Sequence, residues 1–283
     1  MAGRNFRLEF RKIEPISPQW ALLPMLFKFR RKKFVKSRTS FLCQLMVCCA
    51  FGSAVLAAVD APGRVTDLNS NGWFNYFGDH PLGKSRWGVH LEGQWRRSDG
   101  IANWQQLLLR PGVNYKVNSR LLLSAGYGFI DTFQYGDFPV KARFPEHRLW
   151  QQAQLRSNTG KIVWSTRLRF ENRFLGVIAN RSVQSYRYEN RFRALQRVTV
   201  PLKGKIFLTA YEEVFLYVAP YQSSSALDQN RAYGAIGWRL KPGWNLETGY
   251  MLQTLLQRNG RIREANNTLM LSIVSTAPFS RRE

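Results

Sequence analysis

Cysteine is scarce in this chain. The 283 residues include three, all between positions 43 and 49 of one apolar run that spans residues 41–57. A product cleaved after this run contains no cysteine, which excludes disulfides and thiolate metal sites. Helical periodicity is also absent from residue 72 onward, so a helical bundle is excluded as the fold of the remaining chain.

The apolar run has the layout of a signal peptide. It follows a basic stretch and ends in small residues, with Val55 and Ala57 at the minus-three and minus-one positions. A membrane-spanning helix is the competing interpretation, but it needs about 20 apolar residues, and this run is shorter and interrupted by polar and small residues. We therefore predict residues 1–57 as a signal peptide with a long basic n-region, with Met25 as an alternative start. Residues 58–283 then form the exported domain.

Acidic residues are few. The chain has 42 Lys and Arg against 18 Asp and Glu, and removal of the predicted signal peptide, with eleven basic and two acidic residues, leaves 31 against 16. An exported protein does not meet the genome, and these basic residues are spread through strands instead of forming one patch. Nucleic acid is therefore excluded as a partner.

Apolar and polar residues alternate with period two beyond residue 72. In residues 86–96 one face of the expected strand carries Trp87, Val89, Leu91, Gly93 and Trp95, and the other carries Arg86, Gly88, His90, Glu92, Gln94 and Arg96. Eleven such segments, of about ten residues or more, occur between residues 73 and 277. Tight turns and longer polar loops alternate between them, among them an expected long loop over residues 175–185.

This pattern predicts an all-β protein with one closed antiparallel transmembrane β-barrel, short periplasmic turns and longer extracellular loops. If the tight turn at residues 80–85 is periplasmic, a strand must precede residue 73, and residues 64–69 are the segment that could form it. Twelve strands follow, with both termini in the periplasm, and ten is the alternative. A soluble β-sandwich is disfavoured because the strands are long and one face is too charged for a packed core.

Five segments carry a wider resemblance: WFNYFGDHPLGKSRWGVHLEGQWRR (73–97), LLLRPGVNYKVNSRLLLSAGYGF (107–129), EHRLWQQ (146–152), LTAYEEVFL (208–216) and DQNRAYGAIGWRL (228–240). On these segments, which extend over nearly all of the exported chain, the sequence resembles the uncharacterised bacterial family catalogued as domain of unknown function 2490. The resemblance implies a small outer-membrane barrel. It supplies no reaction, substrate or catalytic residue.

Catalytic patterns are missing from the expected strands. Outer-membrane lipid hydrolases place a histidine and a serine two positions apart on one strand face, but no serine stands two positions after His80, His90 or His147. Adjacent Glu212 and Glu213 point to opposite faces of a strand and are not a catalytic pair. No His or carboxylate cluster has metal-ligand spacing. We expect no enzymatic activity, metal or cofactor, and a lipid hydrolase is the weakest alternative.

The inward positions are rich in arginine. The basic residues predicted to line the lumen are Arg86, Arg96, Arg110, Arg148, Arg156, Arg167, Arg169, Arg173, Arg187, Arg191, Arg193, Arg231 and Arg239. The acidic ones are Glu92, Glu146, Glu171, Glu189 and Glu247. One hypothesis has arginine and glutamate pairing across the lumen and filling it. The other, weighed equally, has the arginine excess forming a pore or pocket that favours anions.

The function that follows is a non-enzymatic barrel in the outer membrane of a Gram-negative cell, acting as a narrow channel or small-ligand pocket with an anion-favouring lumen. Its expected partners are outer-membrane lipids, lipopolysaccharide and a small anionic solute. The alternative is a structural or adhesive barrel with a plugged lumen, in which residues 132–145 and 219–229 contact lipopolysaccharide or other partners.

Overall fold

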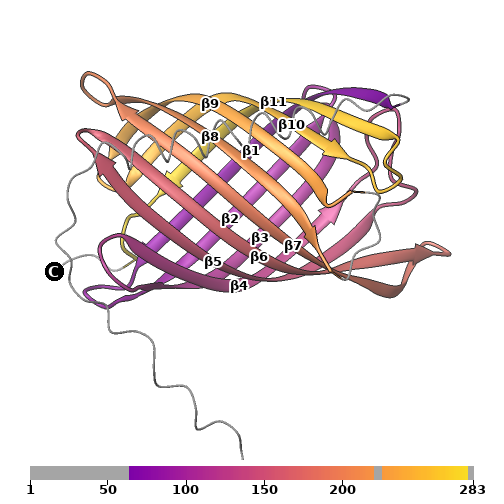
Figure 1. Ribbon diagram of the computed structural model, residues 1–283, viewed down its shortest axis with the longest axis horizontal. Helices are drawn as coiled ribbons and strands as arrows, with labels where there is room; N and C mark the ends of the chain where they lie inside the picture. The colour runs from indigo at the N-terminus through magenta and orange to yellow at the C-terminus, as the bar shows by residue number, and fades with distance from the viewer. Residues whose placement is uncertain (1–63, 220–224, 280–283) are drawn as a thin grey trace, which may run out of the picture. The chain divides into compact units, whose positions relative to one another are not determined.

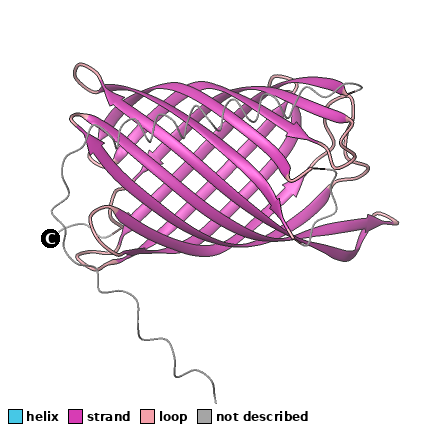
Figure 2. Cartoon of the chain, viewed as in Figure 1, coloured by secondary structure: helices cyan, strands magenta, loops and turns pink. Residues whose placement is uncertain are grey.

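Long alternating segments become long strands. The computed structural model describes residues 64–219 and 225–279, so the predicted signal peptide lies outside the described residues. Figures 1 and 2 show a closed barrel of strands, without a helix in the described part of the chain. The strands are β1 (Val65–Pro81), β2 (Trp87–Ser98), β3 (Asn103–Lys116), β4 (Leu121–Thr132), β5 (Phe144–Thr159), β6 (Ile162–Ala179), β7 (Ser182–Pro201), β8 (Ile206–Val218), β9 (Leu227–Lys241), β10 (Trp244–Leu256) and β11 (Ile262–Ser275). The predicted all-β barrel is confirmed.

The first and last strands close the barrel in parallel. Each strand pairs antiparallel with its neighbour in sequence, and β1 runs alongside β11 in the same direction, from Val65 opposite Ile262 to Gly78 opposite Ser275. The described residues thus form eleven strands, close to the predicted number of about twelve. The expectation of an even number was wrong, because a parallel seam allows an odd number of strands to close a barrel.

The missing first strand does not exist as a separate element. Residues 64–69 and 73–79 belong to one continuous strand, β1, which is 17 residues long. As a result, β1 and β11 begin at the same end of the barrel, at Val65 and Ile262. β11 ends at Ser275, at the opposite end of the barrel. The prediction that both termini of the barrel lie on one side was therefore wrong.

The turns differ in length between the two ends of the barrel. At one end, here called the turn end, the connections are residues 82–86, 117–120, 160–161, 202–205 and 242–243. At the other end, the loop end, they are residues 99–102, 133–143, 180–181, 219–226 and 257–261. Three of the loop-end connections, residues 99–102, 180–181 and 257–261, are therefore as short as those of the turn end.

The connection between β6 and β7 is shorter than predicted. Asn180 and Arg181 both have positive φ, 49° and 61°, as a two-residue type I′ hairpin turn requires. The expected loop over residues 175–185 is mostly strand. The two strands are the longest of the barrel, with 18 and 20 residues, and their hairpin projects past the neighbouring strand ends (Figure 1).

Alternation gives the barrel an apolar outside and a polar inside. On β2, Trp87 and Trp95 are exposed, whereas His90, Glu92 and Arg96 are buried. Apolar side chains in the interior gather in one small cluster, formed by Trp73, Tyr233, Met251 and Met270. Most of the interior is therefore filled by hydrogen-bonding and charged groups, which makes it the candidate site.

Candidate functional site

The strands carry most of the predicted charged residues to the inside of the barrel. The buried arginines are Arg96, Arg110, Arg148, Arg169, Arg173, Arg191, Arg193 and Arg231, and all five predicted acids, Glu92, Glu146, Glu171, Glu189 and Glu247, are buried as well. Arg167 and Arg187 are half-buried.

Three predicted arginines lie elsewhere. Arg86 is exposed in the turn that precedes β2, so its assignment to the lumen was wrong, because the strand begins one residue later than the alternation indicated. Arg156 and Arg239 are exposed near the turn end of β5 and β9. These two border a cavity there and are not part of the buried network.

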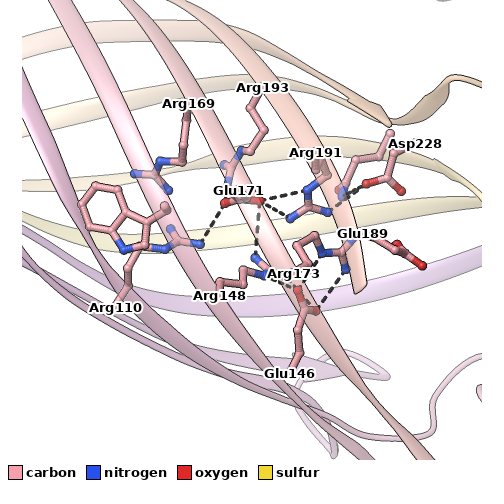
Figure 3. A network of polar contacts seen from close by, with 12 residues as sticks. Arg110, Glu146, Arg148, Arg169, Glu171, Arg173, Glu189, Arg191, Arg193 and Asp228 are labelled. Atoms are coloured by element: carbon pink, nitrogen blue, oxygen red, sulfur yellow. Dashed lines mark hydrogen bonds and ion pairs between the residues drawn. The ribbon is translucent and has the colours of Figure 1, made fainter. Parts of the chain in front are cut away.

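Glu171 on β6 is the centre of this network (Figure 3). Its carboxylate accepts hydrogen bonds from Arg191 Nη2 at 2.7 Å and Arg193 Nη1 at 2.8 Å, and Arg110 Nη2 lies at 3.4 Å. Arg148 Nη1 is 3.9 Å away. These arginines come from β3, β5 and β7, so one carboxylate ties together strands that are not neighbours.

The network continues toward the loop end through two further acids. Glu146 accepts hydrogen bonds from Arg148 and from Arg173, whose Nε lies at 2.6 Å. Arg173 Nη1 lies 3.6 Å from Glu189, which also accepts a 2.8 Å hydrogen bond from Arg187 Nε. Each carboxylate is shared, as expected where arginine forks meet buried acids.

Toward the turn end the acids are Glu92 and Glu213. Glu92 accepts a 2.6 Å hydrogen bond from Arg110. Glu213 on β8 lies 2.8 Å from Arg193 Nη2 and accepts a 2.7 Å hydrogen bond from Arg167 Nη2. The adjacent Glu212 is half-buried, whereas Glu213 is buried. This agrees with the expectation that the two acids lie on opposite faces of the strand.

Aromatic rings stack with arginines in the middle of the lumen. The guanidinium of Arg96 lies 3.8 Å from the ring centre of Trp73, and that of Arg231 lies 5.2 Å from the same ring. Phe215, fully buried, has Arg231 at 4.7 Å. Arg96 donates to Gln94 Oε1 at 2.9 Å, and no carboxylate oxygen in the described residues lies within 4.0 Å of its guanidinium.

Two cavities lie on either side of these residues. The loop-end cavity has about 560 Å³ and is lined by ten basic and five acidic side chains. The turn-end cavity has about 420 Å³, with seven basic and four acidic side chains. Both are bordered by Trp73, Glu92, Gln94, Arg193 and Arg231, which we call the waist. The lumen is thus two basic cavities separated by a layer of stacked and paired side chains.

Several residues of the network were not predicted. Glu213 and Asp228 are buried, and Asp228 lies 2.8 Å from Arg191. Their strands carry aromatic residues on the inward face, including Phe215 and Tyr233, so the polar-inside pattern is blurred. Glu213 lies directly opposite Arg231 in the β8–β9 pair, and this position is the remaining indication that Glu213 points inward. The indication can be used only when the pairing of the two strands is known.

The histidines contact residues other than serine. His90 Nδ1 lies 2.8 Å from Asp79, His80 bonds to Tyr76 and the Ala277 carbonyl, and His147 bonds to Tyr127 and Tyr186. Within residues 64–219 and 225–279, no three His, Cys, Asp or Glu side chains gather as a metal-binding group. No helix there is long and apolar enough to cross a bilayer.

The chain is similar to a known family, to one relative in sequence and to two solved structures. An uncharacterised protein of Methylorubrum extorquens is 29% identical over 171 residues, which cover 58% of this chain and 69% of the relative. Among solved structures, the NanC porin is 11% identical, with a TM-score of 0.45 over 73% of this chain and 98% of the porin. The siderophore receptor PirA of Pseudomonas aeruginosa is 14% identical, with a TM-score of 0.28 over 62% of this chain and 32% of the receptor. The family of Proteins of unknown function DUF2490 matches residues 70–264, so the predicted resemblance is confirmed and the chain belongs to this family.

Proposed function

We propose that the protein is a non-enzymatic β-barrel of the outer membrane whose lumen binds small anionic solutes. The outward face supports a membrane location, because large apolar side chains such as Leu68, Leu149 and Leu269 are at least half exposed on it while the polar side chains are inside. In this proposal the apolar face contacts lipid acyl chains and the loop end contacts lipopolysaccharide.

The observation that carries the proposal is the charge of the loop-end cavity. Ten basic and five acidic side chains line a space of about 560 Å³, and an excess of three positive charges remains when Glu171 and Glu213, which pair with the lining arginines, are also counted. Pockets of 300–1,000 Å³ hold small molecules, and positively charged walls around a low-dielectric interior raise the local concentration of anions. A solute with one or two carboxylate or phosphate groups is the class that fits.

The waist favours a pocket over an open channel. Glu92 and Arg193 are buried, and neighbouring Phe215 is fully buried, so the centre of the lumen is filled by side chains. Salt-bridged arginines there would have to break several charge-assisted hydrogen bonds to let a solute through. The solute is therefore held in the loop-end cavity and not conducted freely.

Calorimetric titration of the purified barrel with inorganic phosphate tests the proposal. Arg96→Ala is expected to weaken binding about tenfold, because this guanidinium lacks a carboxylate partner and its charge is available to a ligand. Arg143→Ala is the matched control, since its side chain is 63% exposed outside the cavity and pairs with Asp131. Unchanged affinity in Arg96→Ala, or no phosphate binding by the wild type, would contradict the proposal.

The second candidate is a structural or adhesive barrel, and the β6–β7 hairpin favours it. The hairpin projects at the loop end and exposes Val183, Tyr186 and Tyr188. Shortening the hairpin should then change surface attachment without changing phosphate binding. Planar-bilayer recording separates both candidates from an open channel, because neither predicts a large conductance.

A further inference from the structure

Two buried carboxylates differ from all the others. Ten Asp and Glu side chains are buried in the described part of the chain, and eight of them have an arginine nitrogen within 4.0 Å. Asp67, 2% exposed, and Glu264, 8% exposed, have none. A buried charge without a partner of opposite sign is costly, so these two carboxylates need a cation that the chain itself does not provide.

The parallel seam brings the two carboxylates together. Asp67 on β1 is directly opposite Glu264 on β11, and Asn69 is directly opposite Asn266 two residues further along. All four are buried inside the barrel. Because paired strands lie about 4.8 Å apart and residues two apart on one strand lie about 7 Å apart, the result is a compact patch of two carboxylates and two side-chain amides.

Two oxygens of this patch are buried without a hydrogen-bond partner. They are Asp67 Oδ1 and Asn266 Oδ1, on side chains that are 2% and 0% exposed. Buried polar atoms are nearly always bonded, and an exception calls for an explanation such as an ion. Two unpartnered oxygens, in a patch whose two carboxylates lack an arginine, are what an oxygen-ligated cation would satisfy.

The loop 133–143 covers the patch. Gly136 has φ 73°, and a Cβ there would lie 2.8 Å from both Asp67 Oδ2 and Asn69 Oδ1, so both side chains point toward the loop backbone. Glu264 accepts hydrogen bonds from the Tyr135 hydroxyl at 2.8 Å, from Gln257 Nε2 at 2.9 Å and from Asn266 Nδ2 at 3.4 Å, but none of these donors carries a positive charge. Burial and the adjacent Glu264 raise the pKa of Tyr135, which keeps its hydroxyl protonated as a donor.

We propose that Asp67, Glu264 and the amide oxygens of Asn69 and Asn266 bind a hard divalent cation, calcium above all. Carboxylates and amide oxygens are the ligands calcium prefers, and it accepts irregular geometry. Zinc or copper is disfavoured, since the site has no His or Cys. The ion connects the first strand to the last and lies beneath the loop at the mouth of the anion pocket, a role separate from the proposed function.

Terbium luminescence, excited through the tyrosines and tryptophans, tests the site on the full-length protein purified in EDTA. We expect one saturable Tb³⁺ site that Ca²⁺ displaces and Mg²⁺ displaces less well, because magnesium keeps its water shell. Asp67→Asn and Glu264→Gln should each weaken Tb³⁺ binding about tenfold or more. Loss of a residue that only supports a metal ligand already lowers metal affinity about tenfold, and loss of the ligand itself should lower it at least as much. Asp131→Asn is the matched control, because this buried carboxylate at the same end already pairs with Arg143.

Thermal unfolding gives a second measurement. If Asp67 had only a structural role, Ca²⁺ would not change the unfolding temperature of the wild type. Ca²⁺ should raise the unfolding temperature of the wild type and leave that of Asp67→Asn unchanged. In EDTA, Asp67→Asn should be the more stable of the two, because the repulsion with Glu264 is gone. The proposal is wrong if the wild type shows no Tb³⁺ site and no Ca²⁺ response, or if both variants keep wild-type binding.

Discussion

Replacing Glu171 by glutamine keeps the volume of the side chain but removes a negative charge that several arginines share. Glu171 is 0% exposed, with nitrogens of Arg191 and Arg193 at 2.7 and 2.8 Å and Arg110 at 3.4 Å. One unit-charge pair at this separation is worth about 6 kcal/mol at an effective dielectric constant of 20, before desolvation is subtracted. Removal of one partner from a buried pair costs about 3–5 kcal/mol, since the other charge stays buried. We expect Glu171→Gln to lower the free energy of unfolding by about 4 kcal/mol.

Urea unfolding of the barrel folded into lipid vesicles, followed by tryptophan fluorescence, measures this loss as a shift in midpoint. Asp131→Asn is the control. Its partner Arg143 is 63% exposed, so that variant should lose less than about 1 kcal/mol. If Glu171→Gln is within about 1 kcal/mol of the wild type, water or mobile ions screen the charges around Glu171, and the reasoning that the buried arginines depend on this carboxylate is refuted.

Three further predictions concern other parts of the structure. Phe215→Ala removes a fully buried ring next to the waist and should raise the single-channel conductance in planar bilayers above that of the wild type. An unchanged conductance would mean that the arginines alone close the lumen. Arg181→Gly relieves a positive φ of 61° in the β6–β7 turn and should stabilise the barrel by about 1 kcal/mol in urea unfolding, whereas a loss would contradict the type I′ assignment. Gly126→Ala places a Cβ 2.3 Å from a carbonyl oxygen of β3 and should lower the free energy of unfolding by about 3 kcal/mol. Gly234→Ala is the control, because nothing lies within 4 Å of its added carbon and its free energy of unfolding should change little. Equal losses in the two variants would show that the close approach of β3 and β4 does not require glycine at position 126.

The strands could be predicted from sequence, but the way the barrel closes could not. Alternation identifies which residues share a face and says nothing about the direction of a strand's partner. The segment Ser70–Asn71–Gly72 has the composition of a turn, which divided β1 into two expected strands. In the fold Gly72 is a strand residue, and a Cβ there would lie 2.6 Å from Ile101 in the loop that packs over it. A long-range contact therefore overrides the local turn propensity.

The arginines were predictable for the same reason, because β6 and β7 carry charge on one face only. Their partners were not. Arg110 on β3 approaches Glu171 on β6, and Arg191 on β7 bonds to Asp228 on β9, across strands that are not adjacent. Such pairs depend on the diameter of the closed barrel and on its register, neither of which is written in any local pattern.

The two hypotheses for the lumen, ion pairs that fill it and a basic pocket that favours anions, are compatible because they concern different depths. Near the waist, carboxylates such as Glu171 each engage several arginines, which closes the lumen. Each cavity still has more basic than acidic side chains, because every shared carboxylate leaves positive charge uncompensated. Removing a matched pair, as in Arg193→Met with Glu213→Leu, should therefore open the waist while leaving the charge excess of the loop-end cavity high. If that double variant conducts and still prefers anions, the pairs close the lumen and the surplus arginines select the solute. Loss of anion preference would instead place selectivity in the waist itself.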